Sequence, residues 1–209
     1  WPATLQATAQ RFLRGFPGAV TYAVKANPAP CVLDNLVAAG LRTFDVASVP
    51  EMQAVRAACP DAALHFHNPV RSRAEIAEGL RLGVQSWSVD RLSELDKLAA
   101  LPPGSEIAVR LKLPVPGAAY DFGAKFGAEP EAAAALRPTV YCGTPDFLKV
   151  MLDRAAQAGK DLSSFRRGLV SGGALFPSLR AEYAGRGIKV LQCYATAEFG
   201  VIAYETASE

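Results

Sequence analysis

From residue 19 to about residue 113 the sequence alternates between two kinds of short segment, and this alternation most restricts its fold. Runs rich in β-branched and aromatic residues are followed by a turn and a stretch with apolar positions three and four apart, the period of an amphipathic helix. The predicted strands are 19–25, 43–47, 63–67, 85–89 and 106–113, and the predicted helices are 32–39, 51–58, 73–82 and 92–99. Such repeats predict a parallel sheet, either in a (β/α) barrel or in an open doubly wound sheet.

A second series of elements begins near Pro138, after a low-information run at residues 131–136. It is predicted as a strand at 139–142, a helix at 146–158, a strand that ends at Ser171-Gly-Gly, a helix after Pro177 and a strand at 189–194. These patterns predict an α/β protein in two parts. The expected parts are a partial (β/α) barrel with parallel strands over residues 1–130, a junction at 131–137 and a second α/β fragment over 138–209.

Two serine–glutamate spacings mark helix starts. Ser48 lies three residues before Glu51, and Ser72 lies three residues before Glu75, which is the spacing of a capping box. We therefore expect these serines to cap the helices at 51–58 and 73–82.

The charge of the chain is nearly balanced, with 22 basic and 20 acidic residues among 209 and a formal net charge of +2. This balance leaves no excess of basic residues that would indicate binding to nucleic acid or to an anionic membrane. Small molecules are therefore the expected partners. No run of about 18 apolar residues is present to span a bilayer. The four cysteines are far apart and form no C-x-x-C pair, which is typical of reduced thiols in a cytoplasmic protein. Because the chain opens at Trp1 rather than Met, we expect a fragment.

Lys25 ends an apolar predicted strand in the segment Tyr-Ala-Val-Lys-Ala-Asn. In a parallel barrel the carboxyl ends of the strands face the active site, so Lys25 is a candidate to form a Schiff base with an aldehyde. Partial burial between Val24 and Ala26 would favour the uncharged amine, which is the nucleophilic form. A lysine that extends from the strand end into solvent is the other interpretation of the same pattern.

Six short motifs follow one another between residues 22 and 128. They are Tyr22-Ala-Val-Lys-Ala-Asn, Phe44-Asp-Val-Ala-Ser, His67-Asn-Pro, Ser88-Val-Asp, Val109-Arg-Leu and Lys125-Phe-Gly-Ala. In order and spacing they resemble the ornithine, diaminopimelate and arginine decarboxylases, which use pyridoxal phosphate (PLP) and have an alanine-racemase-like barrel. The resemblance implies that Lys25 holds PLP covalently and that Asp45 and Arg110 line the cofactor cavity. It also implies that Glu51 and Lys125 form a supporting polar pair.

Each of the two cavity residues also has a plainer interpretation. Asp45, one βα unit on from Lys25, could hold the lysine ammonium or be a carboxylate stabilised at a helix N-terminus. Arg110, which the pattern places inside an apolar strand, would need an acceptor, and a ligand or a structural ion pair would supply it equally well.

His65 and His67 flank Phe66 and so face the same side of one predicted strand, as two metal ligands would. No third ligand is spaced nearby, and His67 belongs to the His-Asn-Pro motif. We therefore expect no metal at this pair.

The second part contains the motifs Ser171-Gly-Gly-Ala and Tyr194-Ala-Thr-Ala-Glu-Phe-Gly. Glycines after a strand allow a backbone to approach a flat ligand, although Ser-Gly-Gly is also a common turn. Together with Gly143-Thr-Pro, Asp161-Leu-Ser-Ser and Ile202-Ala-Tyr-Glu, they resemble the middle of the phenylacetate–CoA ligase group of AMP-forming acyl-CoA synthetases, which implies ATP and Mg²⁺ as ligands. The implied residues are Gly172, Gly173 and Ala174 beside adenine, Tyr194 stacked on it, Thr196 at the phosphate and Glu198 on Mg²⁺, the last of which is otherwise an exposed loop carboxylate.

The two resemblances belong to unrelated families, and each covers an internal piece of its family. We therefore expect a fusion of fragments whose function follows its first part, the PLP-dependent decarboxylation of a basic amino acid of the ornithine, lysine or diaminopimelate class. The segments that would hold the ring and phosphate of PLP are not recognised, so decarboxylation by this chain alone is not expected. The alternatives are an acyl-CoA ligase fragment and a non-enzymatic α/β protein. Half a barrel exposes strand edges, which predicts self-association.

Overall fold

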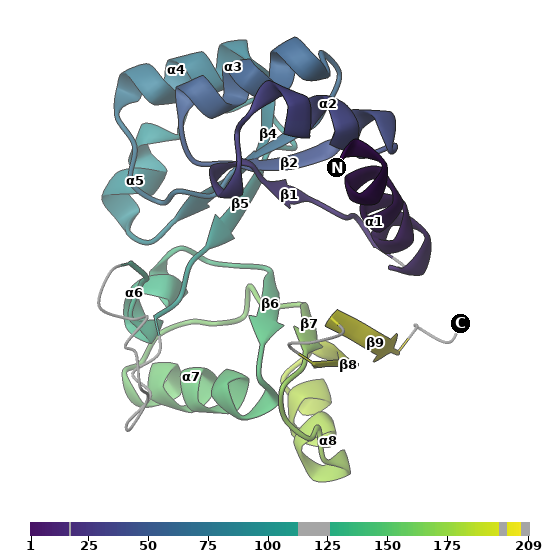
Figure 1. Cartoon of the computed structure of the whole chain (residues 1–209). Helices are drawn as coiled ribbons and strands as arrows, with labels where there is room; N and C mark the ends of the chain where they lie inside the picture. Colours follow the sequence, from purple (N-terminus) through teal and green to yellow (C-terminus); the bar gives the residue numbers. More distant parts are fainter. Residues whose placement is uncertain (17, 113–125, 197–199, 206–209) are drawn as a thin grey trace. The chain divides into compact units, whose positions relative to one another are not determined.

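The computed structural model describes residues 1–16, 18–112, 126–196 and 200–205, with the backbone alone at 194–196 and 200–204. The chain folds into two compact units, Trp1–Arg110 and Leu111–Glu209 (Figure 1). Each unit has its own sheet and its own helices. In the described ranges no helix has the length and apolar character needed to cross a membrane.

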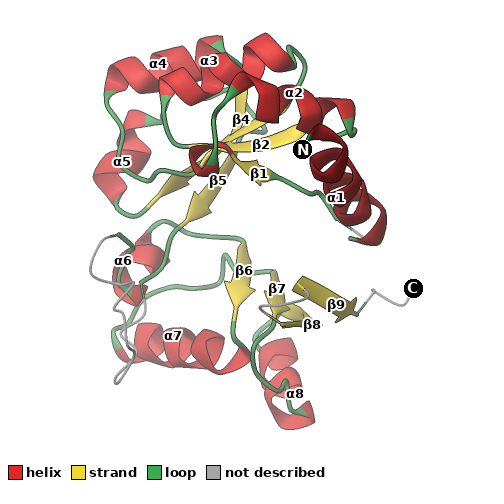
Figure 2. Cartoon of the chain, viewed as in Figure 1, coloured by secondary structure: helices red, strands yellow, loops and turns green. Residues whose placement is uncertain are grey.

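The first unit contains a parallel sheet of five strands that lie in their sequence order, β1 to β5. Right-handed crossovers between successive neighbours place the connecting helices on one face of such a sheet, and Figure 2 shows α2, α3 and α4 along that face. This winding is that of a partial (β/α) barrel, since a doubly wound sheet has helices on both faces. The elements are α1 (Pro2–Gly15), β1 (Tyr22–Ala23), η1 (Val24–Ala26), α2 (Pro30–Ala38), β2 (Thr43–Val46), α3 (Val49–Ala58), β3 (Ala63–Phe66), α4 (Arg73–Arg81), β4 (Val84–Val89), α5 (Leu92–Lys97) and β5 (Glu106–Val109).

The two faces of this sheet differ in polarity. On β2, Phe44 and Val46 are buried while Asp45 between them is half-buried. On β3, Phe66 is fully buried while His65 is half-buried. Because successive side chains of a strand point to opposite faces, the apolar residues pack under the helices and the polar residues share the other face.

The structure confirms the predicted strands and helices of this unit but shortens the first and the last strand by several residues. The first ends at Ala23 because the chain turns into the 3₁₀ helix η1, where the Asn27 N–H donates to the Val24 carbonyl at 3.1 Å. The last ends at Val109, so that Arg110 follows β5 and is exposed rather than buried in a strand as predicted.

The first helix, α1, was not predicted from the sequence. None of its residues is fully buried. Its Gln6 side chain donates to the Asn35 side chain of α2 at 2.7 Å, which joins the two helices.

One of the two predicted capping boxes is complete. The Ser72 hydroxyl accepts from the Glu75 N–H, and the Glu75 carboxylate accepts from the Ser72 N–H at 2.7 Å. At α3 only half of the motif is present, since the Glu51 carboxylate accepts from the Ala47 N–H at 2.9 Å and from the Ser48 hydroxyl at 3.2 Å. Glu51 therefore fixes the loop that enters α3.

The second unit has a four-stranded sheet in the order β6-β7-β8-β9, with the last pair antiparallel. Its core is built around α7 and α8, with Leu148, Met151 and Tyr183 almost fully buried. The elements are α6 (Pro130–Ala135), β6 (Val140–Gly143), α7 (Pro145–Gln157), β7 (Arg167–Val170), α8 (Pro177–Gly185), β8 (Lys189–Thr196) and β9 (Gly200–Tyr204).

The two units divide at Arg110 and Leu111, upstream of the junction expected at 131–137. Leu111 pairs with Ala128 and packs against the core of the second unit. The alanine-rich run that the sequence left without structure forms α6, which therefore belongs to that unit as well.

Candidate functional site on the polar face of the first sheet

Lys25 lies at the carboxyl end of β1, beside the strand that bears Asp45. Ala23 is in register with Asp45 across the β1–β2 pair, and Lys25 follows Ala23 by two residues in η1. Its side chain is exposed, not partly buried as predicted. Lys25 is therefore exposed to solvent at the carboxyl end of β1, next to the polar face of the sheet.

Asp45 has an imidazole beside it, contributed by His67, the residue that follows the neighbouring strand β3. His67 Nδ1 lies 3.1 Å from Asp45 Oδ1, with 40% of the His67 side chain and 29% of the Asp45 side chain exposed. On its other side, His67 Nε2 lies 3.0 Å from the hydroxyl oxygen of Ser86 on β4. The order carboxylate, imidazole, hydroxyl thus runs across three neighbouring strands.

The carboxylate of Asp45 is not fully satisfied. Its Oδ1 is buried and makes no hydrogen bond of normal geometry among the described residues, although His67 Nδ1 lies within ion-pair distance of it. A buried carboxylate oxygen without a donor is costly, so it favours a cationic or N–H donor next to it.

His65 lies beside His67 on the same face, with ring centroids 5.5 Å apart. Burial lowers the pKa of His65, the neighbouring His67 lowers it further, and Glu106 and Asp45 offset the change in part. His65 therefore favours the neutral form. In the described part of the chain no cluster of three metal-ligating side chains occurs.

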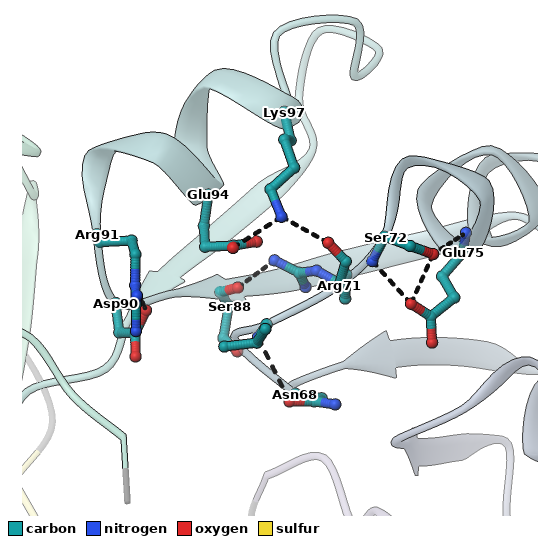
Figure 3. Close-up of polar contacts among 10 residues, drawn as sticks. Asn68, Arg71, Ser72, Glu75, Ser88, Asp90, Arg91, Glu94 and Lys97 are labelled. Carbon is teal, nitrogen blue, oxygen red and sulfur yellow. Dashed lines mark hydrogen bonds and ion pairs between the residues drawn. The ribbon is translucent and has the colours of Figure 1, made fainter.

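Arg71, which the sequence did not single out, is buried at the carboxyl ends of β3 and β4 (Figure 3). Its guanidinium donates to the Phe66 carbonyl at 3.0 Å and to the Ser88 carbonyl. It also lies over the rings of Phe66 and Trp87, 5.3 and 5.4 Å from their centres. The only sequence signal for it is an arginine two residues after the Asn-Pro motif, which indicates a loop.

Two further charged residues, from α5, surround Arg71. Lys97 Nζ donates to the Arg71 carbonyl at 2.6 Å and pairs with Glu94 at 2.7 Å, and Glu94 itself is only 6% exposed. Burial lowers the pKa of Arg71, while Glu94, Glu75 and Asp90 raise it in part. The cluster therefore fixes the loop between β3 and α4 to α5.

Among the remaining predicted site residues, Arg110 follows β5, and its N–H donates to the Val89 carbonyl at 2.8 Å. Lys125, the predicted partner of Glu51, and Glu198, the predicted Mg²⁺ ligand, lie outside the described residues. The structure therefore brings Lys25 and Asp45 to one end of the sheet, and adds His67 and Ser86.

The Gly172–Gly173 pair of the second unit forms a turn after β7. Gly172 has a φ of +71°, and the Gly173 carbonyl accepts from the Gln192 side chain at 3.0 Å. A Cβ at Gly173 would lie 3.3 Å from Pro145 Cδ, so close packing explains the second glycine without a ligand. Ala174 is exposed after this turn, and Tyr194 and Thr196 lie on β8, where only the backbone is described.

Comparison with known families gives one assignment. Residues 3–141 match the family described as "Pyridoxal-dependent decarboxylase, pyridoxal binding domain". This match covers more than half of the chain and includes Lys25, Asp45 and Arg110.

Curated proteins of known function give the same picture. The chain is 36% identical over 115 residues to a lysine/ornithine decarboxylase of Selenomonas ruminantium, a match that covers 54% of this chain and 29% of that protein. It is also 32% identical over 114 residues to a diaminopimelate decarboxylase of Zymomonas mobilis, covering 50% of this chain and 27% of that protein. The matches thus span less than a third of the length of these relatives.

Solved structures show the same fold over nearly the whole chain. The arginine decarboxylase of Paramecium bursaria Chlorella virus bound to agmatine aligns with a TM-score of 0.60 and 17% identity, over 92% of this chain and 62% of that one. The lysine/ornithine decarboxylase of Vibrio vulnificus complexed with cadaverine aligns with a TM-score of 0.55 and 20% identity, over 90% and 60%. Nothing in these comparisons supports the acyl-CoA ligase resemblance, the ATP and Mg²⁺ ligands or a fusion of two families.

Proposed function

This chain belongs to the pyridoxal-dependent decarboxylases through their pyridoxal-binding domain, and from that premise we propose that it acts in the PLP-dependent decarboxylation of a basic amino acid. The substrate class follows from the relatives, whose names include ornithine, lysine and diaminopimelate decarboxylases. Because the matches cover less than a third of those relatives, both the reaction and the substrate are proposals about this chain.

The observation that carries the proposal is the placement of Lys25 beside a half-buried carboxylate, one of whose oxygens is buried without a hydrogen bond of normal geometry. The amine of Lys25 is exposed at the carboxyl end of β1, where a small aldehyde has access to it. Asp45 Oδ1, on the adjacent strand, is buried without an aligned hydrogen bond. A carboxylate in that position suits the ammonium of Lys25 or the protonated nitrogen of a lysine–aldehyde adduct. These residues therefore fit PLP.

When bound, PLP supplies an electron sink that accepts the electron pair left by the departing carboxylate. The part of this chain is to hold and orient it. Lys25 would bind it covalently through Nζ, and Asp45 would keep the attached nitrogen protonated. Glu51 would act from a distance, because its carboxylate fixes the loop after β2 rather than facing Lys25.

A test of the proposal is covalent capture of PLP on Lys25. Purified protein would be incubated with PLP, reduced with borohydride and digested, and the modified peptide would be identified by mass spectrometry. We expect a visible absorbance band that disappears on reduction and a pyridoxyl group on Lys25. Lys25→Ala should lose both, whereas Lys160→Ala, which removes an exposed lysine of the second unit, should keep both.

Two results would contradict the proposal. Equal labelling of Lys25 and Lys160 would show that PLP reacts only with accessible amines. Absence of any adduct on Lys25 at PLP concentrations that label free lysine would show that the site does not bind the cofactor. Release of CO₂ from ornithine, lysine or diaminopimelate, measured with the same protein, tests the predicted absence of decarboxylation by this chain alone.

A further inference from the structure

The polar face of the first sheet contains a carboxylate, an imidazole and a hydroxyl in contact, and the proposed function uses only the carboxylate. The distances are 3.1 Å from Asp45 Oδ1 to His67 Nδ1 and 3.0 Å from His67 Nε2 to the Ser86 oxygen. The backbone of His67 is held too, because its carbonyl accepts from the Ser88 hydroxyl at 2.7 Å. Both the ring and the main chain of His67 are therefore fixed from β4.

Ser86 is placed to support this imidazole rather than to react. It is 5% exposed and lies within β4, in register with His65. A nucleophilic serine needs access to substrate and donors for a developing oxyanion, which a buried mid-strand position does not offer. The Ser86 hydroxyl can instead donate to Nε2, and a neutral ring bonded in that way carries its proton on Nδ1, the nitrogen beside Asp45.

We propose that His67 is a positioning residue for Asp45, held in its Nδ1-protonated form by Ser86, so that the carboxylate stays oriented toward the nitrogen of Lys25. The effect on PLP binding rests on the proposed function. The protonation of the His67 ring rests on the contacts of His67 alone. His67 touches neither Lys25 nor a ligand in this role; it restricts where the Asp45 carboxylate lies. A carboxylate fixed by a second group has less freedom to lose when the lysine adduct forms.

His65, two residues earlier in β3, provides a matched control on the same face. Its ring is near that of His67, but the structure records no hydrogen bond or ion pair between His65 and Asp45. Loss of His65 should therefore leave the Asp45 carboxylate where it is. Since the chain has two histidines, the ring signals of one are assigned by removing the other.

The first test needs no cofactor. Long-range ¹H–¹⁵N correlation spectra of the histidine rings report which ring nitrogen is protonated, and His65→Gln isolates the signals of His67. We expect an Nδ1-protonated ring at neutral pH, a mixture of tautomers in Ser86→Ala and no change in Ser88→Ala. An Nε2-protonated ring in the unmodified chain, or a Ser86→Ala spectrum equal to the parent, would overturn the assignment.

The second test measures the dissociation constant of PLP from the absorbance of the lysine-bound cofactor. We expect His67→Leu to weaken PLP binding about tenfold, the size of one lost polar contact with a charged group. His67→Asn, whose amide N–H stands where Nδ1–H stood, should restore affinity to within about twofold, and His65→Leu should also stay within about twofold. Unfolding curves of the same variants show that each is folded.

The outcomes separate the two proposals. If the parent chain binds PLP on Lys25 and His67→Leu binds it equally well, the positioning role is wrong and the proposed function stands. If the parent chain forms no adduct on Lys25, the proposed function is wrong. The predicted effect of His67 on PLP binding is then wrong as well. Labelling of Ser86 by a fluorophosphonate would also overturn the inference, because it would show an accessible nucleophile where a supporting hydroxyl is proposed.

Discussion

The guanidinium of Arg71 lies 5.4 Å from the centre of the Trp87 ring, although Arg71 belongs to the loop after β3 and Trp87 to the middle of β4. Arg71 is 3% exposed and Trp87 is fully buried. A buried cation of this kind remains only if its donors and its charge are compensated, here by two carbonyls of the same strands and by Glu94 nearby. The contact thus fixes the carboxyl ends of β3 and β4, close to where His67 begins the loop.

Replacing Arg71 should destabilise the first unit strongly. In Arg71→Met the carbonyls of Phe66 and Ser88 lose their donor and Glu94 loses a compensating charge, so we expect a loss of about 3 kcal/mol in the free energy of unfolding. Urea unfolding followed by Trp87 fluorescence measures it. Arg81→Met, which removes an exposed arginine paired with Glu78, should change stability by less than about 0.5 kcal/mol. Similar losses in both variants would contradict the role of Arg71.

Much of the first unit could be predicted from the sequence, because its strands and helices differ sharply in period. β2 and β3 begin at the predicted residues since each buries two apolar side chains against the helices. Two helices escaped prediction for different reasons. α1 has no fully buried residue although its apolar and polar positions do segregate, and α6 lies in an alanine-rich run that lacks the contrast between apolar and polar positions.

Residues of the candidate site could be predicted from the sequence only where they belong to a recognisable motif. Lys25 and Asp45 belong to recognisable motifs, and the register of β1 with β2 places them at one end of the sheet. Ser86 belongs to none, and its contact with His67 depends on the shift of register between Leu64 and His65 on β3, which no local pattern indicates. Arg110 was misplaced because the apolar run suggested a longer strand than β5 forms.

Two glycines in helices should respond oppositely to alanine. A Cβ at Gly79 in α4 would lie 2.7 Å from a ring carbon of Trp87, so Gly79→Ala should destabilise by about 1–3 kcal/mol despite the higher helix propensity of alanine. Gly185 at the end of α8 has nothing within 4 Å of such a Cβ, and Gly185→Ala should stabilise by about 0.5–1 kcal/mol. Thermal unfolding of the two variants tests this, and stabilisation by Gly79→Ala would show that Trp87 is free to move.

Tyr183 is expected to be the more sensitive of two tyrosines in the second unit. Its hydroxyl is buried and donates to the Pro145 carbonyl at 2.6 Å, whereas the Tyr141 hydroxyl donates to the Thr144 carbonyl at 2.9 Å in a less buried position. Tyr183→Phe should cost about 1–2 kcal/mol, because it removes a buried hydrogen bond, and more than Tyr141→Phe. Burial raises the pKa of both tyrosines, that of Tyr183 to about 12. Urea unfolding ranks the variants; an equal cost would contradict the difference in burial.

His65 should make the first unit less stable as the pH falls. Burial and His67 lower its pKa in the folded state, so between that value and the ordinary value of about 6.5 the unfolded chain binds more protons than the folded one. Stability contributed by the neutral ring is therefore complete above pH 6.5 and declines below it. We expect His65→Gln to lose less stability than the parent between pH 7 and pH 5 in urea unfolding. A parallel decline in both proteins would show that His65 does not titrate abnormally.

The outer strands of the first sheet are expected to drive self-association. Within residues 1–16 and 18–110, β1 and β5 each pair with one strand only, and Ile107 on β5 is 39% exposed. Unpaired N–H and carbonyl groups beside an apolar side chain favour pairing with another copy. Light scattering should detect oligomers that Ile107→Lys reduces, because a lysine on an edge strand opposes pairing, whereas Val150→Lys, at an exposed position of α7, should leave them unchanged. A monomeric parent chain would instead show that these edges are protected in solution.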